Sequence, residues 1–136
     1  MKVTLCKFCD FACILQGGKG SVIGMFDAIY APNFPFDQPP VHLCVEFEFD
    51  VEEMGRQQVI ELALLDEDAI DLFRLRAEVQ VPQAPPGRPS RLFHDFILGN
   101  MRFERPGSYR LDIVHDGRVV AEERLYISQA PQSNFS

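Results

Sequence analysis

Strict alternation of apolar and polar residues is the pattern that most constrains this chain, and it is clearest between residues 41 and 50. Five large apolar side chains occupy the odd positions from Val41 to Phe49, and His, Cys, Glu, Glu and Asp occupy the even positions. Because successive side chains of a strand point to opposite faces, this segment predicts a half-buried strand. The same alternation recurs over residues 73–81 and 109–113. The chain is therefore predicted to be all-β.

Turn signals at short spacing divide the chain into about eight predicted strands. Asp116-Gly117 is typical of a type I′ hairpin turn, and Gly17-Gly18-Lys19-Gly20 offers residues that accept a positive φ. The predicted strands cover residues 3–15, 21–31, 40–49, 58–66, 70–81, 92–104, 107–115 and 118–128. This number of short strands predicts an antiparallel β-sandwich. Pro-Gly-x-Tyr at residues 106–109 is similar to the tyrosine corner of immunoglobulin-like sandwiches, so we expect that variant of the fold.

One segment is ambiguous, and the domain boundaries follow from length and composition. Residues 52–78 contain many strong helix formers, so a helix competes with strands over residues 52–66. A hairpin is preferred, because acidic residues 66–68 interrupt the apolar run as a polar tip would. A length of 136 residues fits one domain, which we expect to span residues 1–128, with a flexible tail at 129–136.

Charge and hydropathy disfavour several classes of partner. The net charge is −7 and the basic residues are scattered, which disfavours binding to nucleic acid or to an anionic membrane surface. The sequence shows no secretory signal and no apolar stretch of about 20 residues, so a cytoplasmic location is expected. In that compartment the four cysteines are expected to be reduced.

The cysteines and an acidic tip are the motifs that could suggest a metal. Cys6 and Cys9 lie within a predicted strand, where an odd spacing sends them to opposite faces, and Cys13 lies too far along the strand for joint ligation. They are predicted to be small structural residues with no metal or cofactor, and Cys44 is expected to be the exposed thiol. Asp66-Glu67-Asp68 is a weak candidate for a cation-binding loop, because it lacks the glycine and the spaced ligands of a dedicated calcium loop.

Two aspartates of the first predicted hairpin form the main candidate site. If residues 17–20 close a two- or four-residue loop, Asp10 lies opposite Asp27 on an otherwise apolar face. Like charges directly opposed on a sheet are destabilising, so loop N–H groups, a shared proton or a bridging cation must offset them. The simpler interpretation is that both carboxylates tie loops to the sheet. A loop with an odd number of residues would remove the pair altogether.

Over nearly its whole length, to about Ser128, the chain resembles a family of uncharacterised bacterial proteins, a domain of unknown function. The resemblance implies a stand-alone β-sandwich and brings no known activity, substrate or catalytic residue. Cys6 and Cys13 depart from the family pattern, which has apolar residues there. The matching stretches are residues 5–12, residues 23–32, Leu65-Asp66-Glu67-Asp68, Val81-Pro82, and residues 103–113 around Pro106-Gly107-Ser108-Tyr109.

These observations favour a non-enzymatic interaction or binding module. The positive evidence is the first hairpin, residues 3–15 and 21–31, which is apolar on both faces although a sandwich strand normally has one wet face. Either the proline-rich segments 32–40 and 82–91 cover its outer face, or that face meets another molecule, such as a second copy in a homodimer. The alternatives are a small enzyme or metal-binding domain that uses Asp10 and Asp27, and a structural subunit of a larger assembly.

Overall fold

This computed structural model describes residues 1–131, which contain eleven strands and one short 3₁₀ helix, η1. The all-β class predicted from the alternation is confirmed. The elements are β1 (Lys2–Leu15), β2 (Lys19–Phe26), β3 (Ala28–Ala31), β4 (Phe36–Gln38), β5 (Val41–Phe49), η1 (Val51–Glu53), β6 (Gln57–Leu65), β7 (Asp71–Gln80), β8 (Ser90–Leu98), β9 (Met101–Phe103), β10 (Gly107–His115) and β11 (Arg118–Gln129).

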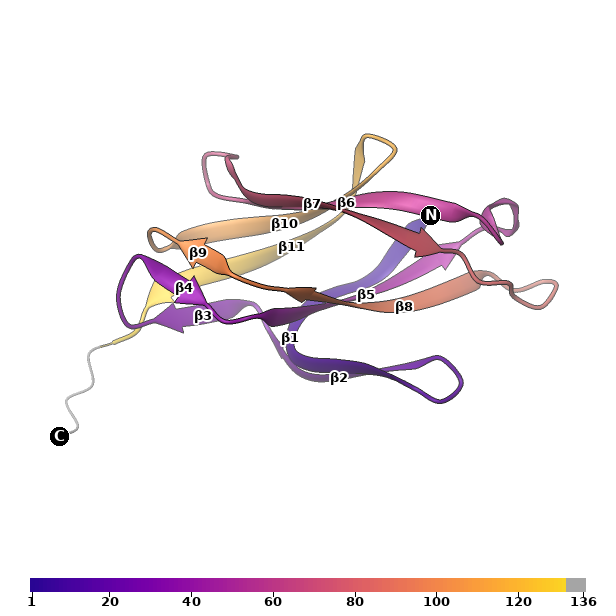
Figure 1. Ribbon diagram of the computed structural model, residues 1–136, viewed down its shortest axis with the longest axis horizontal. Coiled ribbons are helices and arrows are strands. Elements are labelled where there is room, and N and C mark those ends of the chain that lie inside the picture. The colour runs from indigo at the N-terminus through magenta and orange to yellow at the C-terminus, as the bar shows by residue number, and fades with distance from the viewer. Residues whose placement is uncertain (132–136) are drawn as a thin grey trace.

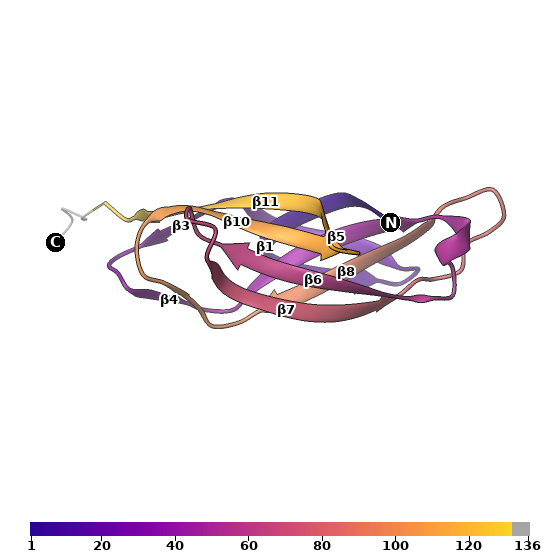
Figure 2. The same cartoon turned by 90° about the horizontal axis from the view of Figure 1, so that it is seen from above.

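Two sheets stack face to face in a sandwich-like arrangement (Figures 1 and 2). Sheet A has the strand order β2-β1-β5-β8, and sheet B has the order β3-β11-β10-β6-β7. Neighbouring strands are antiparallel except for β3, which runs parallel to β11, and β4 pairs only with β9. Residues from alternate positions of both sheets fill the space between them. Fully buried members of this core include Phe8, Leu43 and Phe47 from sheet A and Leu62, Leu111 and Ile113 from sheet B.

All eight predicted strands are present, and three local features raise the number of strands. A bend at Asp27 divides the segment 21–31 into β2 and β3, and Gly99-Asn100, where Asn100 has a φ of 54°, separates β8 from β9. The short strand β4 lies inside the first proline-rich segment. Residues 57–65 and 71–80 pair as the predicted hairpin, not as a helix. Of the predicted tail, Gln129 belongs to β11 and Ala130 donates its N–H to Ala31, whereas residues 132–136 lie outside the described part.

The first hairpin has a different register from the predicted one. Leu15 pairs with Lys19 and Phe11 pairs with Ile23, so residues 16–18 form a three-residue loop. Gly17 and Gly18 have φ values of 85° and 76°, which glycine adopts without steric cost. The assumption of an even-numbered loop was wrong, and with it the predicted pairing of Asp10 with Asp27.

The outer half of this hairpin folds back over sheet A and adds a partial third layer (Figure 1). Strand β1 pairs with β5 through Lys2–Cys9 and with β2 through Phe8–Leu15. Beyond Asp10, Ala12 and Val22 pack against Cys44 of β5 and Phe93 of β8 in a second, smaller core. The hairpin itself therefore covers the outer face of sheet A. Of the two proline-rich segments, residues 32–40 do not cover this face, since Phe34 and Phe36 pack against the main core.

A glycine at the bend makes the fold-back possible. Gly24 has a φ of 70°, and a Cβ placed on it would collide with the Asp10 carboxylate. Cys9 pairs with Met25 and Phe11 with Ile23, so Asp10 and Gly24 lie across from each other between these pairs. The Asp10 side chain thus occupies the space that any other residue at position 24 would fill.

We expect Gly24→Ala to lower the free energy of unfolding by about 1–3 kcal/mol, because it adds a collision to the strain of a positive φ. Gly117→Ala is the matched control, since Gly117 has a φ of 73° with nothing within 4 Å of its Cβ position, and it should cost less. Urea denaturation of Gly24→Ala in wild-type and Asp10→Ala backgrounds measures the coupling. Strictly additive effects would contradict the proposed collision.

Candidate functional site

The two aspartates predicted to pair lie in separate surroundings, and both are exposed. Asp10 faces Gly24 and lines a hollow of about 360 Å³ together with Phe26, Gln38 and Val41, among others. Asp27 lies in the bend between β2 and β3 and lines a different hollow beside Lys7. The backbone carbonyl of Asp27 accepts the N–H of Tyr126 at 2.7 Å. The geometry that suggested a shared proton or a bridging cation is therefore missing.

The acidic residues 66–68 connect the turn at residues 66–70 with the loop at residues 105–108. Asp66 Oδ1 accepts the N–H groups of Asp68 at 2.9 Å and Ile70 at 3.0 Å. Glu67 Oε1 accepts the N–H of Ser108 at 2.7 Å, and Asp68 pairs with Arg105 at 2.8 Å. The carboxylates considered for a cation thus bind protein groups. The turn within residues 66–70 can be predicted from the short spacing between Asp66 and the N–H groups that donate to it. The contacts to residues 105–108 are long-range, so no local sequence pattern predicts them.

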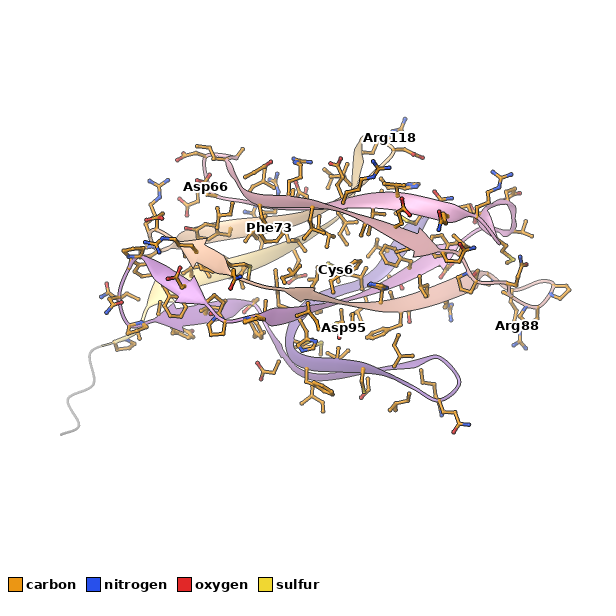
Figure 3. The ribbon with its side chains drawn as sticks, in the orientation of Figure 1. Cys6, Asp66, Phe73, Arg88, Asp95 and Arg118 are labelled. Atoms are coloured by element: carbon orange, nitrogen blue, oxygen red, sulfur yellow. The ribbon has the colours of Figure 1, made fainter. Side chains whose placement is uncertain are left out.

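Tyr109 makes two further contacts next to the loop at residues 105–108. Its hydroxyl donates to the carbonyl of Arg105 at 2.8 Å, and its ring packs edge-on against Phe103. This is the backward bond that Pro-Gly-x-Tyr predicts. Asp66 lies at this end of the sandwich, and Arg88 in the proline-rich loop lies at the other (Figure 3).

Cysteines 9 and 44 lie in the small core beneath the hairpin, and both are fully buried. The expectation that Cys44 is the exposed thiol was wrong, because the folded-back hairpin covers its face of sheet A. Its thiol donates to the carbonyl of Lys7 at 3.4 Å. Burial, with the nearby Cys44 thiol, raises the pKa of Cys9 to about 12, and burial also raises the pKa of Cys44. Neither thiol is therefore an activated nucleophile.

A histidine–aspartate pair, which no local sequence pattern predicts, borders this small core. His42 Nδ1 lies 2.9 Å from both carboxylate oxygens of Asp95, and each side chain is 18% exposed. Figure 3 shows Cys6 between the two sheets and Asp95 on the hairpin side of sheet A. The Phe11 ring lies edge-on to the His42 ring with a centroid distance of 5.6 Å. Phe11 thus contacts the His42–Asp95 pair, and the two thiols of the small core, Cys9 and Cys44, are buried.

Several large apolar side chains of the hairpin are exposed to solvent. Phe11 and Ile23, which pair directly across the two strands, are 49% and 61% exposed. Met25 is 61% and Leu15 is 52% exposed. We call these four residues, Phe11, Leu15, Ile23 and Met25, the hairpin face. Their clustering on one pair of strands distinguishes them from scattered surface apolar residues, which are common on soluble proteins.

The burial pattern predicts the order in which the thiols react. Cys13 is the partly exposed cysteine, and the other three are buried. In the native protein we expect a thiol-specific disulfide reagent to modify Cys13 first at pH 8, and the other three cysteines at least about 100-fold more slowly. The other three are buried, and burial keeps their thiols protonated, as the pKa of about 12 for Cys6 shows. Cys13→Ser should remove the fast phase. Loss of that phase in Cys44→Ser instead would contradict the burial of Cys44 by the hairpin.

Comparisons with known proteins assign the chain to a family. Among residues 1–131, no group of three or more His, Cys, Asp or Glu side chains is arranged to hold a metal ion. No helix in that part of the chain is long and apolar enough to cross a membrane. A search of curated proteins finds no match. Residues 5–128 match a family described as "Family of unknown function (DUF6941)". The chain belongs to this uncharacterised family, DUF6941.

Proposed function

We propose that this protein is a non-enzymatic binding module that contacts another protein through the hairpin face. The observation that supports this proposal is the exposure of Phe11, Leu15, Ile23 and Met25 side by side on β1 and β2. Burying apolar area contributes roughly 25 cal/mol per Å², so a partner that covers these side chains gains stability from each of them. Keeping them in water without a partner would carry a risk of aggregation.

The alternative functions have less support. An enzyme or metal site built on Asp10 and Asp27 required the two carboxylates to face each other, and they line different hollows. The thiols nearest to the His42–Asp95 pair are buried and have raised pKa values. A structural role in a larger assembly uses the same hairpin face and differs only in how permanent the contact is.

Three narrower statements belong to the same proposal. The backward bond of Tyr109 supports an immunoglobulin-like relationship for the sandwich. A cytoplasmic location suits four free cysteines, two of which lie together in the small core. A bacterial setting rests on the resemblance of the sequence to its family.

The proposal predicts that one charge on the hairpin face weakens binding. Ile23→Lys should weaken the complex by at least about 30-fold, as expected when a buried apolar anchor worth 2 kcal/mol is lost. Ile70→Lys is the matched control, because Ile70 is 62% exposed in the turn between β6 and β7 of sheet B, away from the hairpin. Tagged wild-type and variant proteins are compared by quantitative mass spectrometry of their co-purifying proteins. If wild type and Ile23→Lys have the same melting temperature and co-purify with the same proteins, the result would contradict a role for this face.

A further inference from the structure

Strand β2 is an unprotected sheet edge. It ends the strand order of sheet A, so one side of its backbone has no strand partner within residues 1–131. Between Gly20 and Phe26 it carries no charged side chain. Sheets usually guard such edges with charges or keep them short, because exposed N–H and C=O groups accept a further strand.

The other edges of the two large sheets are guarded in those ways. Strand β7 carries Arg74, Arg76 and Glu78, and β8 carries Arg91 and Asp95. Strand β3 is only four residues long. The contrast singles out β2 as the edge at which an added strand meets no charged side chain along its middle.

Two unpaired charges flank this neutral edge, and they have opposite signs. Lys19 is the first residue of β2, and Asp27 directly follows its last residue. Both are exposed, and no ion pair joins either to another residue within 1–131. A strand with a positive start and a negative end is complementary to itself when it pairs antiparallel, because each Lys19 then lies beside the other Asp27.

We propose that a second copy of this chain pairs its β2 antiparallel to this β2 about a two-fold axis at Ile23, so that Lys19 of each copy lies opposite Asp27 of the other. The proposal goes beyond the function proposed above, because the second copy binds the edge of β2 and enlarges the hairpin face without covering it. Ladder bonds join the two edges, so sheet A continues across the dimer. A two-fold axis perpendicular to a sheet keeps like faces together, so the hairpin faces of both copies form one apolar surface with Ile23 at its centre.

The charges also set the orientation of the pair. Glu123 lies near Asp27 and adds negative charge at that end of the strand, which the Lys7–Glu123 contact of 3.4 Å offsets in part. Since each copy carries a net charge of −7, general electrostatics oppose the dimer, and the local Lys19–Asp27 contacts must act against that repulsion. This opposition makes a charge-exchange experiment decisive.

We expect Lys19→Asp and Asp27→Lys each to weaken dimerisation about tenfold or more, because each variant replaces two opposite-charge contacts per dimer with two like-charge contacts. The double variant Lys19→Asp/Asp27→Lys should recover most of the wild-type affinity. Asp116→Lys, which changes the net charge in the same way as Asp27→Lys but at an exposed turn of sheet B, should not weaken the dimer. Sedimentation equilibrium from about 1 to 300 µM measures all four against wild type.

The outcomes separate this proposal from the general one. A wild-type chain that stays monomeric at about 300 µM overturns the pairing of two β2 edges. The co-purification experiment with Ile23→Lys can still support the binding of another protein to the hairpin face. An Asp27→Lys variant that dimerises more tightly than wild type shows that only net charge acts, and overturns the antiparallel arrangement. Failure of the double variant to recover affinity, with wild-type melting behaviour, does the same.

Discussion

The packing of the folded-back hairpin on the outer face of sheet A determines much of the rest of the structure. That face carries Cys44 and Phe93, which an ordinary sandwich would leave in water, and the hairpin places Ala12 and Val22 over them. Gly20 fits against the ring of Phe93, where a Cβ would collide, and Gly24 lets the strands turn beside Asp10. A small core thus forms from short side chains, because the two layers approach closely.

Covering one apolar face in this way exposes another. A two-stranded hairpin has two faces, and when the one with Ala12 and Val22 is buried, the one with Phe11 and Ile23 meets solvent. The fold-back also leaves β2 at the end of its sheet with one side of its backbone unpaired. The proposed binding surface is therefore the consequence of how the hairpin covers sheet A, and the two cannot be altered independently at Gly24.

Local patterns predicted the strands well and the long-range placement poorly. Alternation identified β5 and β7, and Asp116-Gly117 adopts positive φ at both residues, as a type I′ turn requires. The register of the first hairpin failed because Gly17, Gly18 and Gly20 permit loops of two, three or four residues with similar ease. Cys44 shows the other limit, since its alternation correctly places it on the outer face of β5, while its burial depends on a hairpin that no local pattern positions there.

Polar groups that already have hydrogen-bond partners within the chain indicate a structural cluster, whereas unpaired ones can bind a partner. The acidic tip and β2 differ in this respect. At the tip, Asp66, Glu67 and Asp68 each bind a backbone N–H or a guanidinium within the chain, so a cation would have to displace contacts already made. Along β2, no strand within residues 1–131 pairs with the outward backbone groups, and Val22, Ile23, Met25 and Phe26 are apolar. Adding a strand there exchanges water bonds for ladder bonds at little cost and removes apolar area from water. The motif with the more conspicuous charges is therefore the weaker site, and the nearly neutral edge is the stronger one.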